Sequence, residues 1–124
     1  KQAQLVATGY MVHKALKVAD LLKTDGIDLG VIDLFQLPCD GDALVKQAKA
    51  APKLFTLEEH FLPGGMGSAI LEMLADRGAA IPVRRFGLGD PGTYSYVYGG
   101  REAIHASYGL APEAIAAEIR KALK

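Results

Sequence analysis

Two glutamates and a histidine stand at the end of an apolar run, Leu54-Phe-Thr-Leu-Glu-Glu-His60, just before a glycine-rich turn, Gly64-Gly-Met-Gly-Ser68. Along a strand, side-chain alternation places Glu58 and His60 on one face and Glu59 on the other. A carboxylate beside an imidazole is typical of an acid–base pair or of part of a metal site. Glu58 and Glu59, on opposite faces, cannot easily work as a paired acid and base on one bond.

The sequence completes neither kind of site around this pair. His13 and His105 are too isolated in the sequence to be assigned to the same centre, and no HExxH spacing occurs. We therefore expect Glu58, Glu59 and His60 to form a hydrogen-bonded cluster with a structural or interface role. Acid–base catalysis and metal binding stay open as alternatives.

The glycine turn has two interpretations. Backbone N–H groups at the start of a helix attract negative charge, so Gly64 and Gly65 are candidate anion contacts. The turn nevertheless lacks the Gly-Lys-Ser/Thr ending of a P-loop and the spacing of G-x-G-x-x-G. The structural interpretation is that Gly64 and Gly65 permit positive φ at a tight entry, while Gly67 lets the helix approach the sheet closely.

Three tyrosines, Tyr94, Tyr96 and Tyr98, alternate at period two between glycines. In an extended segment their rings lie on one side. Tyrosine combines a large apolar ring with a polar tip and is favoured at protein interfaces. We expect either a contact surface for another chain or domain, or an edge strand folded back on its own domain.

Composition limits the classes of protein. The 124 residues fit one domain, 1–124, and 14 basic against 14 acidic side chains give no nucleic-acid footprint. Cys39 is the only cysteine, which excludes an internal disulfide and a thiolate metal cluster and agrees with a cytoplasmic location. No apolar run approaches the ~20 residues that span a bilayer, so no membrane partner is expected. Lys1 at the first position suggests a fragment of a larger protein or a processed chain.

Apolar runs of strand length alternate with segments of helical period. Strands are predicted over residues 4–8, 29–34, 53–58 and 83–88, and helices over 11–23, 40–51 and 66–78 and from Pro112 onward. Strict alternation implies parallel strands joined by right-handed crossovers, a doubly wound α/β fold. The expected strand order, second-first-third-fourth, brings residues 8–10 and 58–60 together in a crevice at the switch point.

Five motifs, in this order and at these distances, carry a family resemblance: Ala7-Thr-Gly9, Leu37-Pro-Cys-Asp40, Leu57-Glu-Glu-His60 with the glycine turn, Gly99-Gly-Arg101, and Tyr108-Gly-Leu110. Together they resemble the C-terminal domain of transketolase-like, thiamine-diphosphate-dependent enzymes. The resemblance implies a three-layer α/β/α sandwich with a mostly parallel sheet of four to five strands. The fifth strand, antiparallel in the family, would lie upstream.

The resemblance also implies that assembly and catalysis belong to different domains of the parent enzyme. Separate N-terminal and middle domains hold thiamine diphosphate and Mg in the parent enzyme, so no catalytic, cofactor-binding or metal residue is expected in this chain. The catalytic glutamate of the family belongs to the middle domain and does not transfer to Glu58 or Glu59. The expected partners are those domains, on the same polypeptide or a separate subunit, and a second copy in a homodimer.

The function that follows is a non-catalytic assembly and dimerisation domain of a transketolase-type enzyme, which transfers a two-carbon ketol unit between sugar phosphates. A deoxyxylulose-phosphate synthase and the β subunit of a 2-oxo-acid dehydrogenase are alternative parents. A free-standing anion- or nucleotide-binding module is the alternative of another class.

Overall fold

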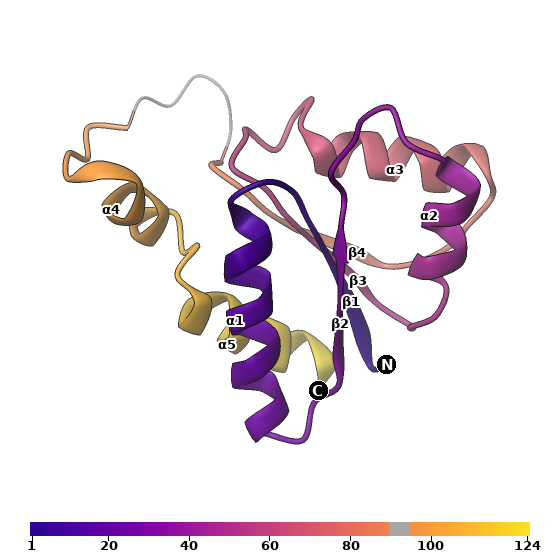
Figure 1. Cartoon of the computed structure of the whole chain (residues 1–124), viewed down its shortest axis with the longest axis horizontal. Coiled ribbons are helices and arrows are strands. Elements are labelled where there is room, and N and C mark those ends of the chain that lie inside the picture. The colour runs from indigo at the N-terminus through magenta and orange to yellow at the C-terminus, as the bar shows by residue number, and fades with distance from the viewer. Residues whose placement is uncertain (90–94) are drawn as a thin grey trace.

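The computed structural model describes residues 1–89 and 95–124. Strands alternate with helices through most of the chain, and two helices end it (Figure 1). The strands are β1 (Ala3–Ala7), β2 (Leu29–Asp33), β3 (Leu54–Leu57) and β4 (Val83–Phe86). The helices are α1 (Met11–Thr24), α2 (Gly41–Ala48), α3 (Met66–Asp76), α4 (Gly100–Ser107) and α5 (Pro112–Leu123). The predicted elements are thus present, and α4 is an addition.

The sheet has the predicted topology. Its order is β2-β1-β3-β4 and every neighbouring pair is parallel. Leu5 of β1 lies opposite Val31 on one side and Phe55 on the other. The described residues supply four strands, so the further antiparallel strand that the resemblance implies is not among them.

Local chemistry explains where helices start and stop. Asp40 caps α2, because its carboxylate accepts the N–H groups of Asp42 and Ala43 at 3.0 and 3.1 Å. Pro112 opens α5, where the missing N–H costs no hydrogen bond. Gly26 follows the last turn of α1, and its φ of +73° lets the chain turn away from the helix.

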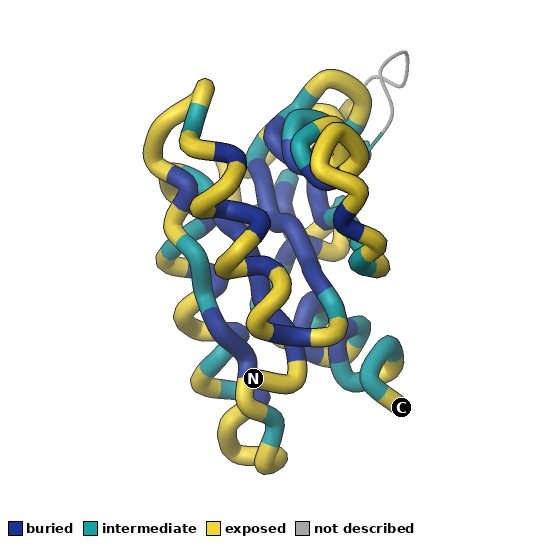
Figure 2. Tube along the Cα trace, turned by 90° about the vertical axis from the view of Figure 1, so that its right-hand side faces the viewer, coloured by how far each residue is buried: buried dark blue, intermediate teal, exposed yellow. Residues whose placement is uncertain are grey.

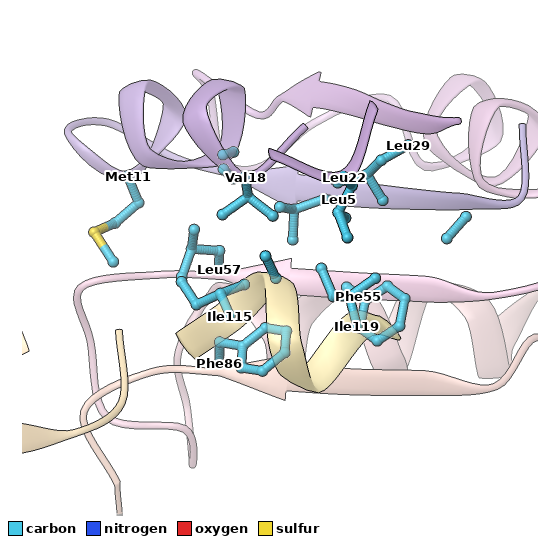
Figure 3. Packing of buried hydrophobic residues seen from close by; sticks show 14 of the residues in the cluster. Leu5, Met11, Val18, Leu22, Leu29, Phe55, Leu57, Phe86, Ile115 and Ile119 are labelled. Atoms are coloured by element: carbon cyan, nitrogen blue, oxygen red, sulfur yellow. The ribbon is translucent and has the colours of Figure 1, made fainter. Parts of the chain in front are cut away.

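Two apolar cores lie on the two faces of the sheet. One contains Leu5 and Phe55 and is covered by α1 and α5 (Figure 3). The other contains Val6 and Leu54 and is covered by α2 and α3. The result is the predicted three-layer sandwich, with α1 and α5 on one side of the sheet and α2 and α3 on the other (Figure 1). Buried residues run through the strands, while exposed ones gather on the outer turns of the helices and on the loops (Figure 2).

Helix α4 stands apart from this arrangement. It lies beside the N-terminal end of α1 (Figure 1), and His105 is its one buried residue. Polar contacts, rather than an apolar face, therefore hold it to the domain.

Candidate functional site

Glu58 and Glu59 follow directly after β3, and their side chains point to opposite faces of the sheet. As predicted from strand alternation, Glu58 turns toward α3 and Glu59 toward α4, on opposite faces of the sheet. Each carboxylate is the centre of its own set of hydrogen bonds.

Glu58 caps helix α3 from inside the protein. Its carboxylate is fully buried; Oε1 accepts the N–H of Gly67 at 2.8 Å and Oε2 accepts the N–H of Met66 at 2.5 Å. The Nδ1 atom of His60 lies 3.2 Å from the same Oε2 and donates to it. A negative charge at the positive end of the helix dipole is a favourable placement. The predicted pairing of Glu58 with His60 is confirmed, in a capping arrangement.

The glycine turn is shaped around this carboxylate. A Cβ atom on Gly65 would lie 2.2 Å from Glu58 Oε2, and one on Gly67 would lie 2.9 Å from Glu58 Oε1. Gly64 has φ +75°, as predicted, and its N–H donates to Ser68 Oγ at 3.0 Å. The prediction of positive φ at Gly65 is wrong: φ there is −81°, and the residue is glycine because the carboxylate needs the space.

This geometry bears on the prediction that Gly64 and Gly65 contact an anion. The N–H groups of Gly64, Met66 and Gly67 each donate to a side chain of this domain. The anion that the turn holds is the carboxylate of Glu58. The N–H group of Gly64 is therefore already used within the domain, and an anion contact at Gly65 stays a prediction.

Glu59 belongs to a closed ring of polar contacts that we call the α4 network. Its Oε1 accepts from Arg101 Nε at 2.7 Å and from His105 Nε2 at 2.9 Å. Lys14 Nζ is 2.8 Å from His105 Nδ1 and 2.8 Å from a carboxylate oxygen of Glu102. The ring closes because Tyr10 donates to Glu102 at 2.7 Å and the Arg101 guanidinium lies 4.3 Å from the centre of the Tyr10 ring. Its members are Tyr10, Lys14, Glu59, Arg101, Glu102 and His105.

The network determines which nitrogen of His105 carries the proton. Lys14 has three N–H donors and no acceptor, and it has three acceptors within reach: His105 Nδ1, Glu102 and, at 3.4 Å, the carbonyl oxygen of Leu110. Nδ1 must therefore accept, so the proton is on Nε2, which donates to Glu59. Both buried side chains, Lys14 and His105, are satisfied in this way.

Two of the three exposed members of the network, Tyr10 and Glu102, have altered acidities. The hydrogen bond from the Lys14 ammonium, and then that from Tyr10, lower the pKa of Glu102. Donation to the same carboxylate raises the pKa of the Tyr10 hydroxyl. Both shifts favour the ionised carboxylate and the protonated phenol that the ring contains.

The crevice expected at the switch point is occupied by α4. Side chains of Arg101 and His105 connect Glu59, after β3, to Tyr10 and Lys14 on the other side of that crevice. Apolar periodicity did not predict this helix, and the position of His105 in the sequence gave it no partner. A usable signal was Gly109, which has φ +70° and ends the helix as a C-terminal glycine should.

The tyrosine segment is partly described. Tyr94 lies outside the described residues; Tyr96 and Tyr98 are 82% and 93% exposed in a stretch that is not a strand. Their rings do not pack on this domain. A contact surface for another protein stays a prediction.

The described residues do not suit the metal and cofactor of the parent family. Across 1–89 and 95–124, no group of three or more His, Cys, Asp or Glu side chains is placed to hold a metal ion. At the α3 N-terminus, a position suited to a pyrophosphate, the N–H groups of Met66 and Gly67 bind the carboxylate of Glu58. In the same parts of the chain, no helix has the length and apolar character needed to cross a membrane.

The fold and the site define a doubly wound α/β domain. Its polar groups lie at the edge of the sheet where such folds bind ligands, and they form hydrogen bonds with one another. The chain belongs to the family described as the transketolase C-terminal domain, which it matches over residues 1–115. The resemblance carried by the five motifs is thereby confirmed.

Two individual relatives of the chain are longer enzymes that contain a similar sequence. The chain is 39% identical to 1-deoxy-D-xylulose-5-phosphate synthase of Syntrophotalea carbinolica, covering 95% of this chain and 18% of the relative. It is 41% identical to 1-deoxy-D-xylulose-5-phosphate synthase 2 of Geobacter sulfurreducens, covering 94% and 18%. The chain thus spans less than a fifth of the length of these curated relatives.

Two solved structures share the fold. One, described as a split gene transketolase, inactive beta4 tetramer, is 36% identical with a TM-score of 0.84, over 99% of this chain and 39% of that one. The other, transketolase from Campylobacter jejuni, has a TM-score of 0.62 over 98% of this chain and 17% of that one. At 16% identity the second likeness concerns the fold alone.

Proposed function

We propose that this chain is the C-terminal assembly domain of a thiamine-diphosphate-dependent enzyme acting on sugar phosphates, and that it supplies no catalytic group. The observation that carries the proposal is the fate of the candidate residues. The carboxylate of Glu58 caps α3, and the carboxylate of Glu59 accepts hydrogen bonds from Arg101 and His105. A general acid or base must reach a proton of the substrate, and these carboxylates are already bonded within the domain.

The parent enzyme has two candidates, each with its own support. Identities of 39% and 41% over nearly the whole chain favour a 1-deoxy-D-xylulose-5-phosphate synthase, which the sequence analysis held as an alternative. The TM-score of 0.84 with a split gene transketolase favours a transketolase whose C-terminal part is a separate subunit. We place the synthase first, because two curated relatives exceed the 36% identity of the split gene chain.

The partners in this proposal are the remaining domains of the enzyme and a second copy of the chain. Thiamine diphosphate and Mg bind to the remaining domains. The split gene transketolase, of which this chain covers 39%, is described as an inactive beta4 tetramer, which supports self-association of a part of the enzyme that contains such a domain.

Calorimetric titration tests the cofactor claim. The purified chain should show no saturable binding of thiamine diphosphate in the presence of Mg²⁺. Saturable binding would contradict the proposal.

A second experiment identifies the parent. The chain is combined with the remaining part of its enzyme, and two products are assayed: 1-deoxy-D-xylulose 5-phosphate, and the sugar phosphates of ketol transfer. Formation of the first supports the synthase and formation of the second supports transketolase. If a correctly assembled complex showed neither activity, the assignment would be refuted.

His60→Ala in that complex separates assembly from catalysis. Because His60 contacts Glu58, we expect any loss of turnover to follow a loss of assembly or of melting temperature. Turnover that is abolished while both of these are unchanged would restore the acid–base interpretation.

A further inference from the structure

Helix α4 lies between glycine residues and is held to the domain by polar contacts (Figure 1). It begins at Gly99 and Gly100, whose φ values are +128° and +82°, and Gly109, with φ +70°, follows its C-terminal end. His105 is its one buried residue, and the chain is anchored again at Leu110, which is 1% exposed. An element with so little buried apolar surface opens at a lower free energy than the sheet and the helices packed on it.

The contact between Lys14 and His105 suits only one protonation state of the imidazole. Lys14 Nζ lies 2.8 Å from His105 Nδ1, and the two residues are 4% and 1% exposed. An ammonium group can only donate, so Nδ1 must offer its lone pair. A proton on Nδ1 would place two donors and two positive charges face to face, away from water. The ring of Tyr10, whose centre lies 6.1 Å from that of the imidazole, offers no charge to compensate.

The other charged groups around the imidazole do not reverse this preference. Glu59 already accepts the Nε2–H group of the neutral ring at 2.9 Å, and the same oxygen accepts from Arg101. Lys14 is in turn paired with Glu102. The α4 network thus balances two cations against two carboxylates, and an added proton would give it a net positive charge.

We propose that α4 is a pH-dependent latch: it is docked against α1 and the end of β3 at neutral pH, and protonation of His105 releases it from the switch-point crevice. In water, the released imidazole takes up the proton without facing an ammonium group. Histidine side chains titrate near pH 6.5, so release increases as the pH falls through that range. Release leaves Lys14 and Glu59, both bonded to α4 in the docked form, free at the crevice. The latch concerns this domain alone and does not depend on the proposed function.

Amide hydrogen exchange of the 124-residue chain, followed by NMR as a function of pH, tests the latch. A helix of eight residues is not stable alone in water, so the amides of residues 104–107 should lose protection when α4 is released. Uptake of one proton should lower their protection factors by about tenfold between about pH 7.5 and about pH 5.5. The amides of β1 and β3 should keep theirs, because carboxylates titrate below this range.

Two variants and a control identify the group that responds to pH. His105→Gln keeps an acceptor for Lys14 and a donor for Glu59 but takes up no proton, so the protection of α4 should no longer depend on pH. Lys14→Met keeps an apolar side chain and removes the ammonium group, so acid should no longer release the helix. His13→Gln is the matched control, because His13 is exposed on α1 and its replacement should leave the wild-type response unchanged.

Three results would overturn the latch. The first is a wild-type chain whose α4 keeps its protection over this pH range, and the second is a loss of protection that affects β1 and β3 equally. The third is a wild-type response that persists in a folded His105→Gln or Lys14→Met variant. Thermal unfolding shows which variants are folded, and if one of them is not, the other decides.

Discussion

Glu58→Gln tests the claim that a buried carboxylate caps α3. Glutamine keeps the size of the side chain but replaces one oxygen by an NH₂ group, which cannot accept a hydrogen bond. One of the two N–H groups of Met66 and Gly67 then loses its acceptor, and the negative charge at the helix N-terminus is removed.

The magnitude follows from these two losses. A hydrogen bond to a charged group contributes about 1.5 to 3 kcal/mol, and the charge–dipole interaction adds about 0.3 to 1 kcal/mol. Burying a neutral amide costs less than burying a carboxylate, which offsets part of the sum. We expect the free energy of unfolding to fall by about 2 to 3 kcal/mol.

Urea unfolding followed by circular dichroism measures the change. With a slope of about 1 to 3 kcal/mol per M, the midpoint should fall by about 0.7 to 3 M at unchanged slope. Glu72→Gln is the matched control, since Glu72 is exposed on α3 and should shift the midpoint little. If Glu58→Gln lost no more than this control, the cap would contribute nothing to stability and the explanation of the glycine turn would fail with it.

Three further results are expected. Gly67→Ala should lower the unfolding free energy by about 1 to 3 kcal/mol, since its Cβ would lie 2.7 Å from Arg85 Cδ; an unchanged urea midpoint would contradict this. Because the folded-state pKa of Glu102 is lowered, its contribution to stability is present above its unfolded value, about 4.5, and is lost as pH falls through the lower folded value. The stability difference between wild type and Glu102→Gln should accordingly shrink on acidification below that range, and a difference that grows there would be inconsistent with the network. In the complete enzyme, Tyr96→Ala or Tyr98→Ala should weaken association by about 2 kcal/mol with little effect on melting temperature, whereas a large loss of fold stability with unchanged association in sedimentation would place the rings in the domain's own core.

The sheet and its polar edge could be predicted because they follow from period-two alternation and crossover handedness. Those rules suffice to place Glu58 and His60 on one face, Glu59 on the other, and β1 next to β3. The same rules do not say which groups meet a carboxylate, so the capping of α3 could not be derived. Gly65 illustrates the difference: its type signals a constraint, and only coordinates show that the constraint is space.

Helix α4 could not be found by looking for apolar periodicity. Its buried residue is His105, and it contacts the domain through the ion pairs Arg101–Glu59 and Glu102–Lys14. Helix α4 has eight residues and a single large apolar side chain, Ile104, which is too little for its period to be identified from apolar spacing. Lys14 is hidden for the complementary reason, as a buried lysine within an apolar helix face.

The last helix has a consequence for how the chain is made. Ile115 and Ile119 of α5 cover the same face of the sheet as α1 and are fully buried against it. During synthesis, the apolar face around Leu5 and Phe55 therefore lacks this cover until α5 has been made. A nascent or truncated chain ending before Ile115 would expose this face and be prone to aggregate. Completion of this face thus depends on α5, most of which lies past residue 115, where the family match stops.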